Sequence, residues 1–248
     1  MQQTTQAWKE IVATEGHRFE TRVILDGNTL TQEKIRLVSR DRPGMDGEKP
    51  TIGGALISTL RLVISEMEFE IPKRAEITIE ARARVNNRTS GWIKQGTYFV
   101  NTRTTDEGNI NLLEIEAVDA MAYAEADYPD TTHDWPWPDI EVVREIAAEI
   151  GVEVEPRTEE LMTAHYMVNL PASYTMRETL GHIAASYCGN FIITAENKLL
   201  LVPLYGLNPE VTGFYLAAEK SATLGPGGEI VEDGTALVFG NEGWFILV

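Results

Sequence analysis

The chain has 248 residues, of which 43% are hydrophobic and 24% charged, which is ordinary usage for a folded globular protein with a sizeable core. Its formal net charge of −17 argues against a nucleic-acid-binding protein of the usual basic kind, because such a chain is not drawn to a phosphate backbone. The single cysteine excludes an intramolecular disulfide and a metal site made of several thiolates, and no window has the pattern of a signal peptide or the apolar length of a membrane span.

Period-two alternation from about Arg18 to Asp119 predicts antiparallel β structure, with successive strands forming a meander. In the first strand, Phe19, Val23 and Leu25 are expected to share one face. The clearest strand is residues 76–85, whose apolar side chains point to one side. Its outward-facing residues form a candidate subunit-contact face, with a plain solvated face as the alternative; they are Glu80, Arg82 and Arg84.

A segment rich in glycine and proline, from Arg40 to Gly54, interrupts the strands. It is too long for a tight turn, so we expect a mobile excursion there.

The pattern changes after Tyr128, where the proline-broken stretch YPDTTHDWPWPD predicts a linker that ends at Asp139. Apolar residues then recur at helical spacing as far as Gly151. Asp139 is expected to cap this helix and Gly151 to end it, and a short strand should follow at residues 152–155.

A second helix is predicted by the capping box of Thr175 and Glu178, with Gly189 at its C-terminal cap. The strands that follow should form a hairpin whose turn is at Asn197, because asparagine tolerates a left-handed turn. The two helix-glycine-strand segments predict a small α/β insert beside a β domain, rather than a doubly wound sheet.

From Gly206 onward, short strands with glycine-rich turns are predicted again. The apolar run from Trp244 to Val248 needs a neighbouring strand, so we expect either that the chain is cut within a second β domain or that another subunit covers this edge.

No residue pattern supports nucleophilic, P-loop or zinc-protease chemistry. His182 and Cys188 are six residues apart and lie off a common helix face. We interpret His182 as an exposed helix residue and Cys188 as a small apolar filler. We therefore predict that the chain is not an enzyme and carries no cofactor or metal.

The linker contains the residues whose side chains are best suited to binding a ligand, Asp134, Trp135 and Trp137. Paired tryptophans could stack on a sugar ring and carboxylates could bind calcium, but the Asp spacing matches no calcium loop. Tryptophans between prolines more often fill the gap between two domains. The three residues are therefore a candidate ligand site or a candidate domain contact.

Two long sequence segments resemble parts of the baseplate hub proteins of tailed phages and prophages, which are related to the spike hubs of type VI secretion. One is WIKQGTYFVNTRTTDEGNINLLEIEAVDAMAYAEADY, from Trp92 to Tyr128, and the other is SYTMRETLGHIAASYCGNFIITAENKLLLVPL, from Ser173 to Leu204. They occur in the family's order and together cover 69 of the 248 residues.

The resemblance implies a homotrimer that joins the sixfold tail tube to the spike or tip. Its expected partners are other copies of itself, a tail tube or distal tail protein, and a spike or tip protein, with DNA passing through unbound. The expected location is the virion tail, assembled in the host cytoplasm. A tail-associated cell-wall hydrolase and a carbohydrate-binding tail accessory protein are the alternatives.

We therefore predict a mainly β (α+β) protein without a membrane span. The expected parts are an antiparallel, tube-like β domain at residues 15–127, the α/β insert at 128–205 and part of a second β domain at 206–248.

Overall fold

The computed structural model describes residues 4–30, 32–44, 51–65, 70–105, 112–129 and 134–204, together with three short strands nearer the C-terminus. The chain divides into a compact unit of residues 1–204 and a second unit of residues 205–248. In the second unit, where short strands are predicted, the described strands form a small antiparallel sheet. They are β15 (Thr223–Leu224), β16 (Ile230–Glu232) and β17 (Thr235–Leu237).

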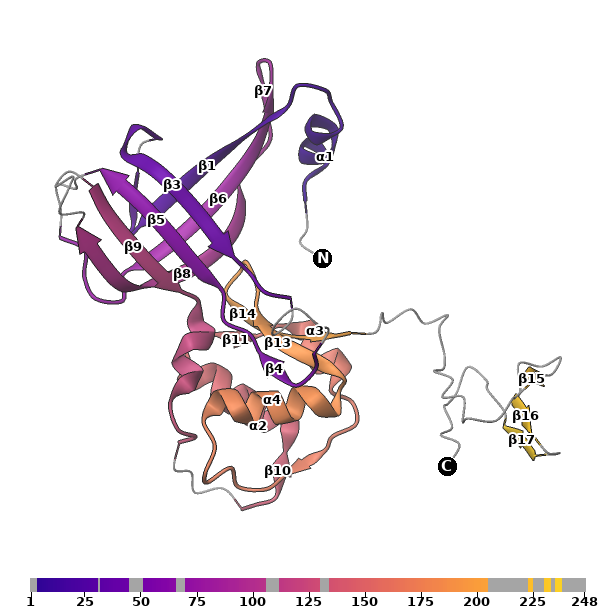
Figure 1. The fold of residues 1–248 in the computed structure, drawn as a ribbon. Helices are drawn as coiled ribbons and strands as arrows, with labels where there is room; N and C mark the ends of the chain where they lie inside the picture. The colour runs from indigo at the N-terminus through magenta and orange to yellow at the C-terminus, as the bar shows by residue number, and fades with distance from the viewer. Residues whose placement is uncertain are drawn as a thin grey trace. The chain divides into compact units, whose positions relative to one another are not determined.

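The larger unit is built on a curled, eight-stranded antiparallel sheet (Figure 1). Its strand order is β2-β1-β6-β8-β9-β5-β3, and β7 pairs with the end of β6. Together with the helical parts described below, this sheet confirms the predicted mainly β class. The strands are β1 (Arg18–Leu25), β2 (Asn28–Thr29), β3 (Ile35–Asp41), β5 (Thr59–Ser65), β6 (Glu76–Val85), β7 (Arg88–Thr89), β8 (Ile93–Thr105) and β9 (Leu112–Val118).

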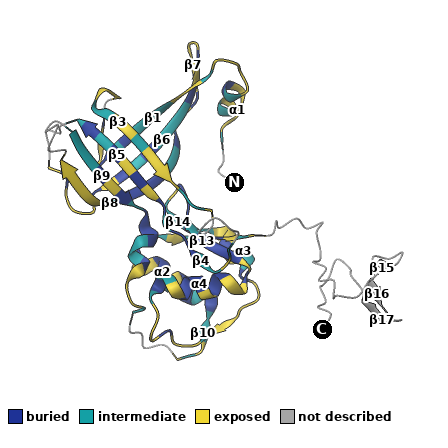
Figure 2. Ribbon diagram, in the orientation of Figure 1, coloured by how far each residue is buried: buried dark blue, intermediate teal, exposed yellow. Residues whose placement is uncertain are grey.

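The alternation in the sequence accounts for the buried face of this sheet (Figure 2). Leu62, Ile77 and Ile115, from three strands, are fully buried in one core. Phe19 is an exception, because it is 56% exposed. Its ring contacts Trp8 of the N-terminal helix α1 (Gln6–Val12), with 5.6 Å between ring centroids, so this part of β1 extends beyond the main core.

The predicted meander is correct only for β6, β8 and β9, which pair in sequence order. β5 does not pair with β6, the next long strand in the sequence. It pairs antiparallel with β9 on one side and with β3 on the other. The β3–β5 pair therefore lies at the far edge of the sheet from β1, and the pairing of β5 with β9 is a long-range contact that alternation alone does not specify.

The α/β part has a four-stranded sheet of order β11-β14-β13-β4 and a separate β10-β12 pair. The two predicted helices are present, and the apolar face of each is buried in a common core. The elements are the 3₁₀ helix η2 (Ala120–Glu125), β10 (Trp137–Pro138), α2 (Asp139–Glu149), β11 (Glu153–Val154), α3 (Pro156–Leu161), β12 (Met167–Val168), α4 (Met176–Ser186), β13 (Gly189–Ile193) and β14 (Lys198–Pro203).

Part of the segment predicted to be a mobile excursion is a strand of this second sheet. β4 (Gly54–Ala55) pairs in parallel with β13. The buried Asn190 side chain fixes it, because its amide nitrogen donates to the Thr51 carbonyl at 2.8 Å and its oxygen accepts from the Gly54 N–H at 2.8 Å. The prediction was therefore wrong for Gly54, and also for Arg40 and Asp41, which belong to β3. Residues 45–50 lie outside the described residues.

The ends of the helices follow the predicted signals with two differences. Thr175 and Glu178 form the capping box of α4, and Gly151 follows α2 with a φ of +75°. The left-handed residue after α4 is Cys188, with a φ of +49°, whereas Gly189 already belongs to β13. Asp139 is the first residue of α2 rather than its N-cap, although its side chain accepts from the next backbone N–H, at Ile140.

Helix α4 packs on β4 through glycine. A Cβ atom added to Gly181 would lie 2.6 Å from the Gly53 carbonyl oxygen, closer than real Cβ atoms approach. Gly53 itself has a φ of +82° and lies against Ala185. The two glycines therefore allow the close approach of helix and strand that buries the face of α4.

We expect Gly181→Ala to lower the free energy of unfolding by about 1–3 kcal/mol, the usual cost of overpacking, even though alanine favours a helix. Urea denaturation measures this change. Gly91→Ala is the matched control, since its added Cβ atom meets nothing within 4 Å. Equal stability of the two variants would contradict the close packing of α4 on β4.

Candidate functional site

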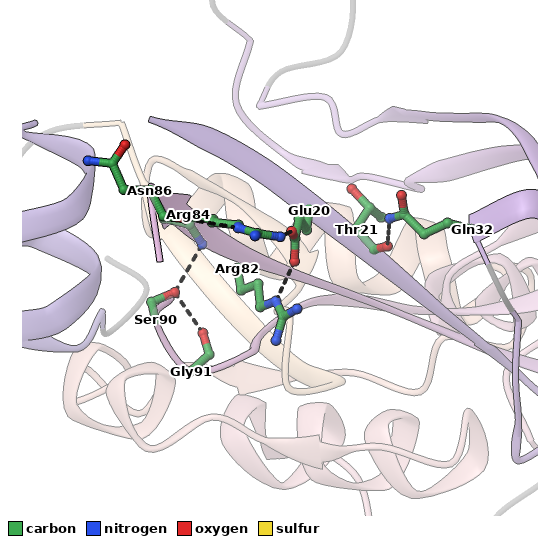
Figure 3. Close-up of polar contacts among 9 residues, drawn as sticks. Glu20, Thr21, Gln32, Arg82, Arg84, Asn86, Ser90 and Gly91 are labelled. Atoms are coloured by element: carbon green, nitrogen blue, oxygen red, sulfur yellow. Dashed lines mark hydrogen bonds and ion pairs between the residues drawn. The ribbon is translucent and has the colours of Figure 1, made fainter. Parts of the chain in front are cut away.

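The predicted contact residues lie in a network of ion pairs across β1 and β6, which we call the charged face; Figure 3 shows its part around Glu20, Arg82 and Arg84. Glu20 accepts hydrogen bonds from Arg82 at 2.6 Å and from Arg84 at 3.0 Å. Arg22 is paired with Glu80 in the same way. The structure thus brings together Glu80, Arg82 and Arg84, and adds Glu20 and Arg22, which the sequence analysis did not select.

Trp92 completes the charged face from the residue before β8. The guanidinium groups of Arg22 and Arg82 each lie 4.5 Å from the centroid of its ring. Both are cation–π contacts, which orient the arginines while leaving N–H groups for the carboxylates.

The turn beside the charged face is held by backbone groups. The hydroxyl oxygen of Ser90 accepts from the Ala83 N–H at 2.9 Å, and the hydroxyl donates to the Gly91 carbonyl at 2.9 Å. At the other end, Gln32 donates to the Thr21 carbonyl at 2.9 Å (Figure 3). These bonds fix both ends of the face.

The charges of the face balance one another. The guanidinium groups of Arg84 and Arg82 hold the pKa of Glu20 below its usual value. The side chains remain partly accessible, from 18% for Glu80 to 50% for Arg84. Such a surface can recognise a partner through oriented hydrogen bonds, but it presents no concentrated charge of one sign.

The linker residues Trp135 and Trp137 are half-buried and pack against the core of the α/β part, whereas Asp134 is exposed. The two indole rings meet edge to face, with 6.0 Å between centroids, and Tyr128 contacts Trp135 in the same manner. Nothing in this geometry tests sugar binding or a domain contact, so both stay predictions.

His182 and Cys188, which the sequence analysis considered together, are both exposed. His182 is exposed, as predicted, and its ring contacts that of Tyr174 at 4.9 Å between centroids. Cys188 is exposed too, so the prediction of a buried filler was wrong. The reason is its position in the left-handed turn after α4, which directs it away from the helix's apolar face.

A buried carboxylate, which the sequence analysis did not select, joins the β sheet to the α/β part. One oxygen of Asp119 accepts from the Ser58 N–H at 2.9 Å and the other from the Met121 N–H at 3.1 Å. The Asp119 N–H in turn donates to the Ser58 carbonyl at 3.0 Å. We call Ser58 and Asp119 the joint.

Burial raises the pKa of Asp119 to about 6, while its hydrogen bonds with Ser58 and Met121 and the nearby Arg42 lower it. The sequence signal for this residue is an aspartate directly after a strand and before a short helical segment, the position of an N-cap.

The structure also has a pocket of about 350 Å³ that the sequence analysis did not predict. One wall of this pocket is formed by short segments without periodicity, which give no sequence signal. It lies between α4 and residues 166–171, and we call it the α4 pocket. Asp139 contributes to its lining although only 1% of the residue's surface is exposed. The Tyr187 hydroxyl donates to Asp139 at 2.5 Å, and burial together with this bond raises the pKa of Tyr187.

Among the residues that the structure describes, no three His, Cys, Asp or Glu side chains are grouped so that they could hold a metal ion. In the same part of the chain, no helix combines the length and apolarity needed to cross a bilayer.

The fold is thus a curled antiparallel sheet with an α/β part built from two segments of the chain. It is similar to the crystal structure of the 43 kDa tail protein of prophage MuSo2 from Shewanella oneidensis, with a TM-score of 0.51 and 13% sequence identity over 77% of this chain. A tail protein from Neisseria meningitidis MC58 matches over 82% of this chain, with a TM-score of 0.48 and 12% identity.

The chain spans 57% of the length of each of these proteins. No family model matches the sequence, and no curated protein does either. The structural comparison with the Shewanella protein therefore shows a shared fold.

For Asp119, the folded state binds the proton more tightly than the unfolded chain, whose ordinary pKa is 3.8. Protonation of this group should therefore stabilise the folded state fully below about pH 4. As the pH rises to about 6 this stabilisation is lost, and the free energy of unfolding should fall by at most about 3 kcal/mol. Urea denaturation across this range should show a slope that Asp119→Asn removes. Asp134→Asn, at an exposed carboxylate, is the control and should keep the wild-type slope; identical slopes in all three proteins would contradict the assignment.

Proposed function

We propose that this protein is a structural component of a phage or prophage tail, a baseplate hub subunit that joins the tail tube to the spike or tip. The observation that carries the proposal is the fold shared with the 43 kDa prophage tail protein. The two segments that resemble hub proteins, residues 92–128 and 173–204, support it independently, because that resemblance depends on the sequence and not on the fold.

The geometry of the sheet supports assembly through its edges. In the described part of the chain, β3 pairs only with β5, so its other side carries unpaired backbone groups. Leu37 on this strand is 40% exposed. A ring of subunits would pair such edges and continue the curl of one sheet into the next, as a tube requires.

In this proposal, the protein forms a homotrimer whose partners are the tail tube or distal tail protein and the spike or tip protein. It acts in the virion tail after assembly in the host cytoplasm, and its role needs no catalysis. The net charge of −17 suits a passage for DNA, because like charges keep a polyanion from adhering.

We expect the purified protein to have three times the 27.6 kDa chain mass in light scattering after size exclusion, and to bind its tail tube protein. Arg84→Glu should weaken the trimer by about tenfold or more, because it places a second carboxylate beside Glu20 on the contact face.

Arg157→Glu is the matched control, since Arg157 is similarly exposed and also paired with a glutamate, Glu155. It should leave the trimer intact. A wild-type protein that stays monomeric and ignores the tail tube protein would refute the hub proposal, whereas equal behaviour of the two variants would refute only the role of the charged face.

A further inference from the structure

The α4 pocket is built from side chains of three parts of the insert. Its wall on α4 contains Thr179, His182, Ile183 and Ser186, and α2 contributes Asp139. The opposite wall is the segment from Tyr166 to Pro171, with Tyr174 beyond it. None of these residues belongs to the charged face or to the joint.

Backbone hydrogen bonds hold the pocket open in a defined shape. The Asp139 N–H donates to the Tyr166 carbonyl at 2.9 Å, which ties the segment to the start of α2. β12 then pairs with β10 at Trp137 and Pro138. At the other end, the Tyr128 N–H donates to the Tyr174 carbonyl at 3.1 Å. A preformed pocket of this kind lowers the ordering cost of binding.

The rim of the α4 pocket is apolar and accessible. Tyr166, Met167, Leu170 and Tyr174 are each between 47% and 56% exposed, and they are four of the nine large hydrophobic side chains that are exposed in the described chain. Their clustering around one pocket is the feature expected of an interaction site rather than of scattered surface residues.

The acidic residue Asp139 also lines the pocket, with only 1% of its surface exposed. Asp139 accepts one bond from the Ile140 N–H at 2.8 Å and one from the Tyr187 hydroxyl at 2.5 Å. Within the described chain, no lysine or arginine is paired with Asp139 or lines the pocket, and His182 is the only basic residue in its lining. A buried carboxylate without a cation favours a positively charged partner group.

We propose that the α4 pocket binds an extended segment of another protein that inserts an arginine or lysine side chain between two apolar residues. The cationic end pairs with Asp139, and the aliphatic stem and flanking residues cover the apolar rim. In the described structure β12 pairs only with β10, which leaves one edge for backbone pairing with such a segment. The inference does not rest on the proposed tail role, since only residues of the α/β part carry it.

The test uses the full chain and three synthetic peptides, acetyl-Leu-Arg-Leu-amide and its counterparts with citrulline or glutamate in place of arginine. Citrulline matches the shape of arginine without its charge. In amide NMR titrations to about 10 mM, the arginine peptide should shift the signals of Thr179, His182 and Ser186 and saturate, whereas the citrulline peptide should bind about tenfold more weakly and the glutamate peptide least.

Two variants separate binding from folding. Asp139→Asn should remove the preference for arginine over citrulline. Because this change also touches the start of α2, Ser186→Arg provides a second test by placing a guanidinium group at the pocket, which should abolish peptide binding. Ser173→Arg, exposed and outside the pocket lining, is the control and should bind as the wild type does.

Absence of any shift at the highest concentration, shifts outside the pocket, or equal binding of the arginine and citrulline peptides would each overturn the proposal.

Discussion

The pairing of Asp119 with Ser58 is the interaction on which the rest of the larger unit depends. The chain leaves the β sheet after β3, adds β4 to the second sheet, and returns at Ser58 to begin β5. It leaves the β sheet again after β9, at Asp119. The Ser58 N–H donates to the buried Asp119 carboxylate and the Asp119 N–H donates to the Ser58 carbonyl. Because these two bonds tie the crossings together, the ends of β5 and β9 are fixed where the second core begins.

Elements whose signals are local could be predicted from the sequence, and those that depend on distant partners could not. The alternation in β6 and the capping box of α4 lie within a few residues, so their positions were confirmed. β4 is only two residues long and becomes a strand because β13, more than 130 residues later, pairs with it. Likewise, the need for glycine at Gly181 appears only when β4 lies against α4.

The residues of the candidate site also divide into those with a local sequence signal and those brought in by distant partners. The outward face of Glu80, Arg82 and Arg84 follows from period two, but Glu20, Arg22 and Trp92 join it through strand pairing and a ring contact. The α4 pocket had no sequence signal, because Tyr166 to Pro171 shows neither helical nor strand periodicity over a useful length. In the sequence, Asp139 has the signal of a helix cap at the end of an acidic linker.

Two surfaces with different chemistry follow from this architecture. The charged face lies on the β sheet and has balanced, oriented ion pairs, which suit a complementary surface on a neighbouring subunit. The α4 pocket lies on the α/β part and has an apolar rim around one carboxylate. In the proposed hub, the first surface would serve the ring and the second would recruit a further protein from outside it.

Electron microscopy of the protein mixed with preformed tail tube is the most direct test of the central claim, that this chain is a tail hub subunit. The account predicts a ring with threefold symmetry at one end of the tube, with the curled sheets continuing the tube wall. Bare tube ends beside free monomers, at concentrations where the tube itself is stable, would contradict it.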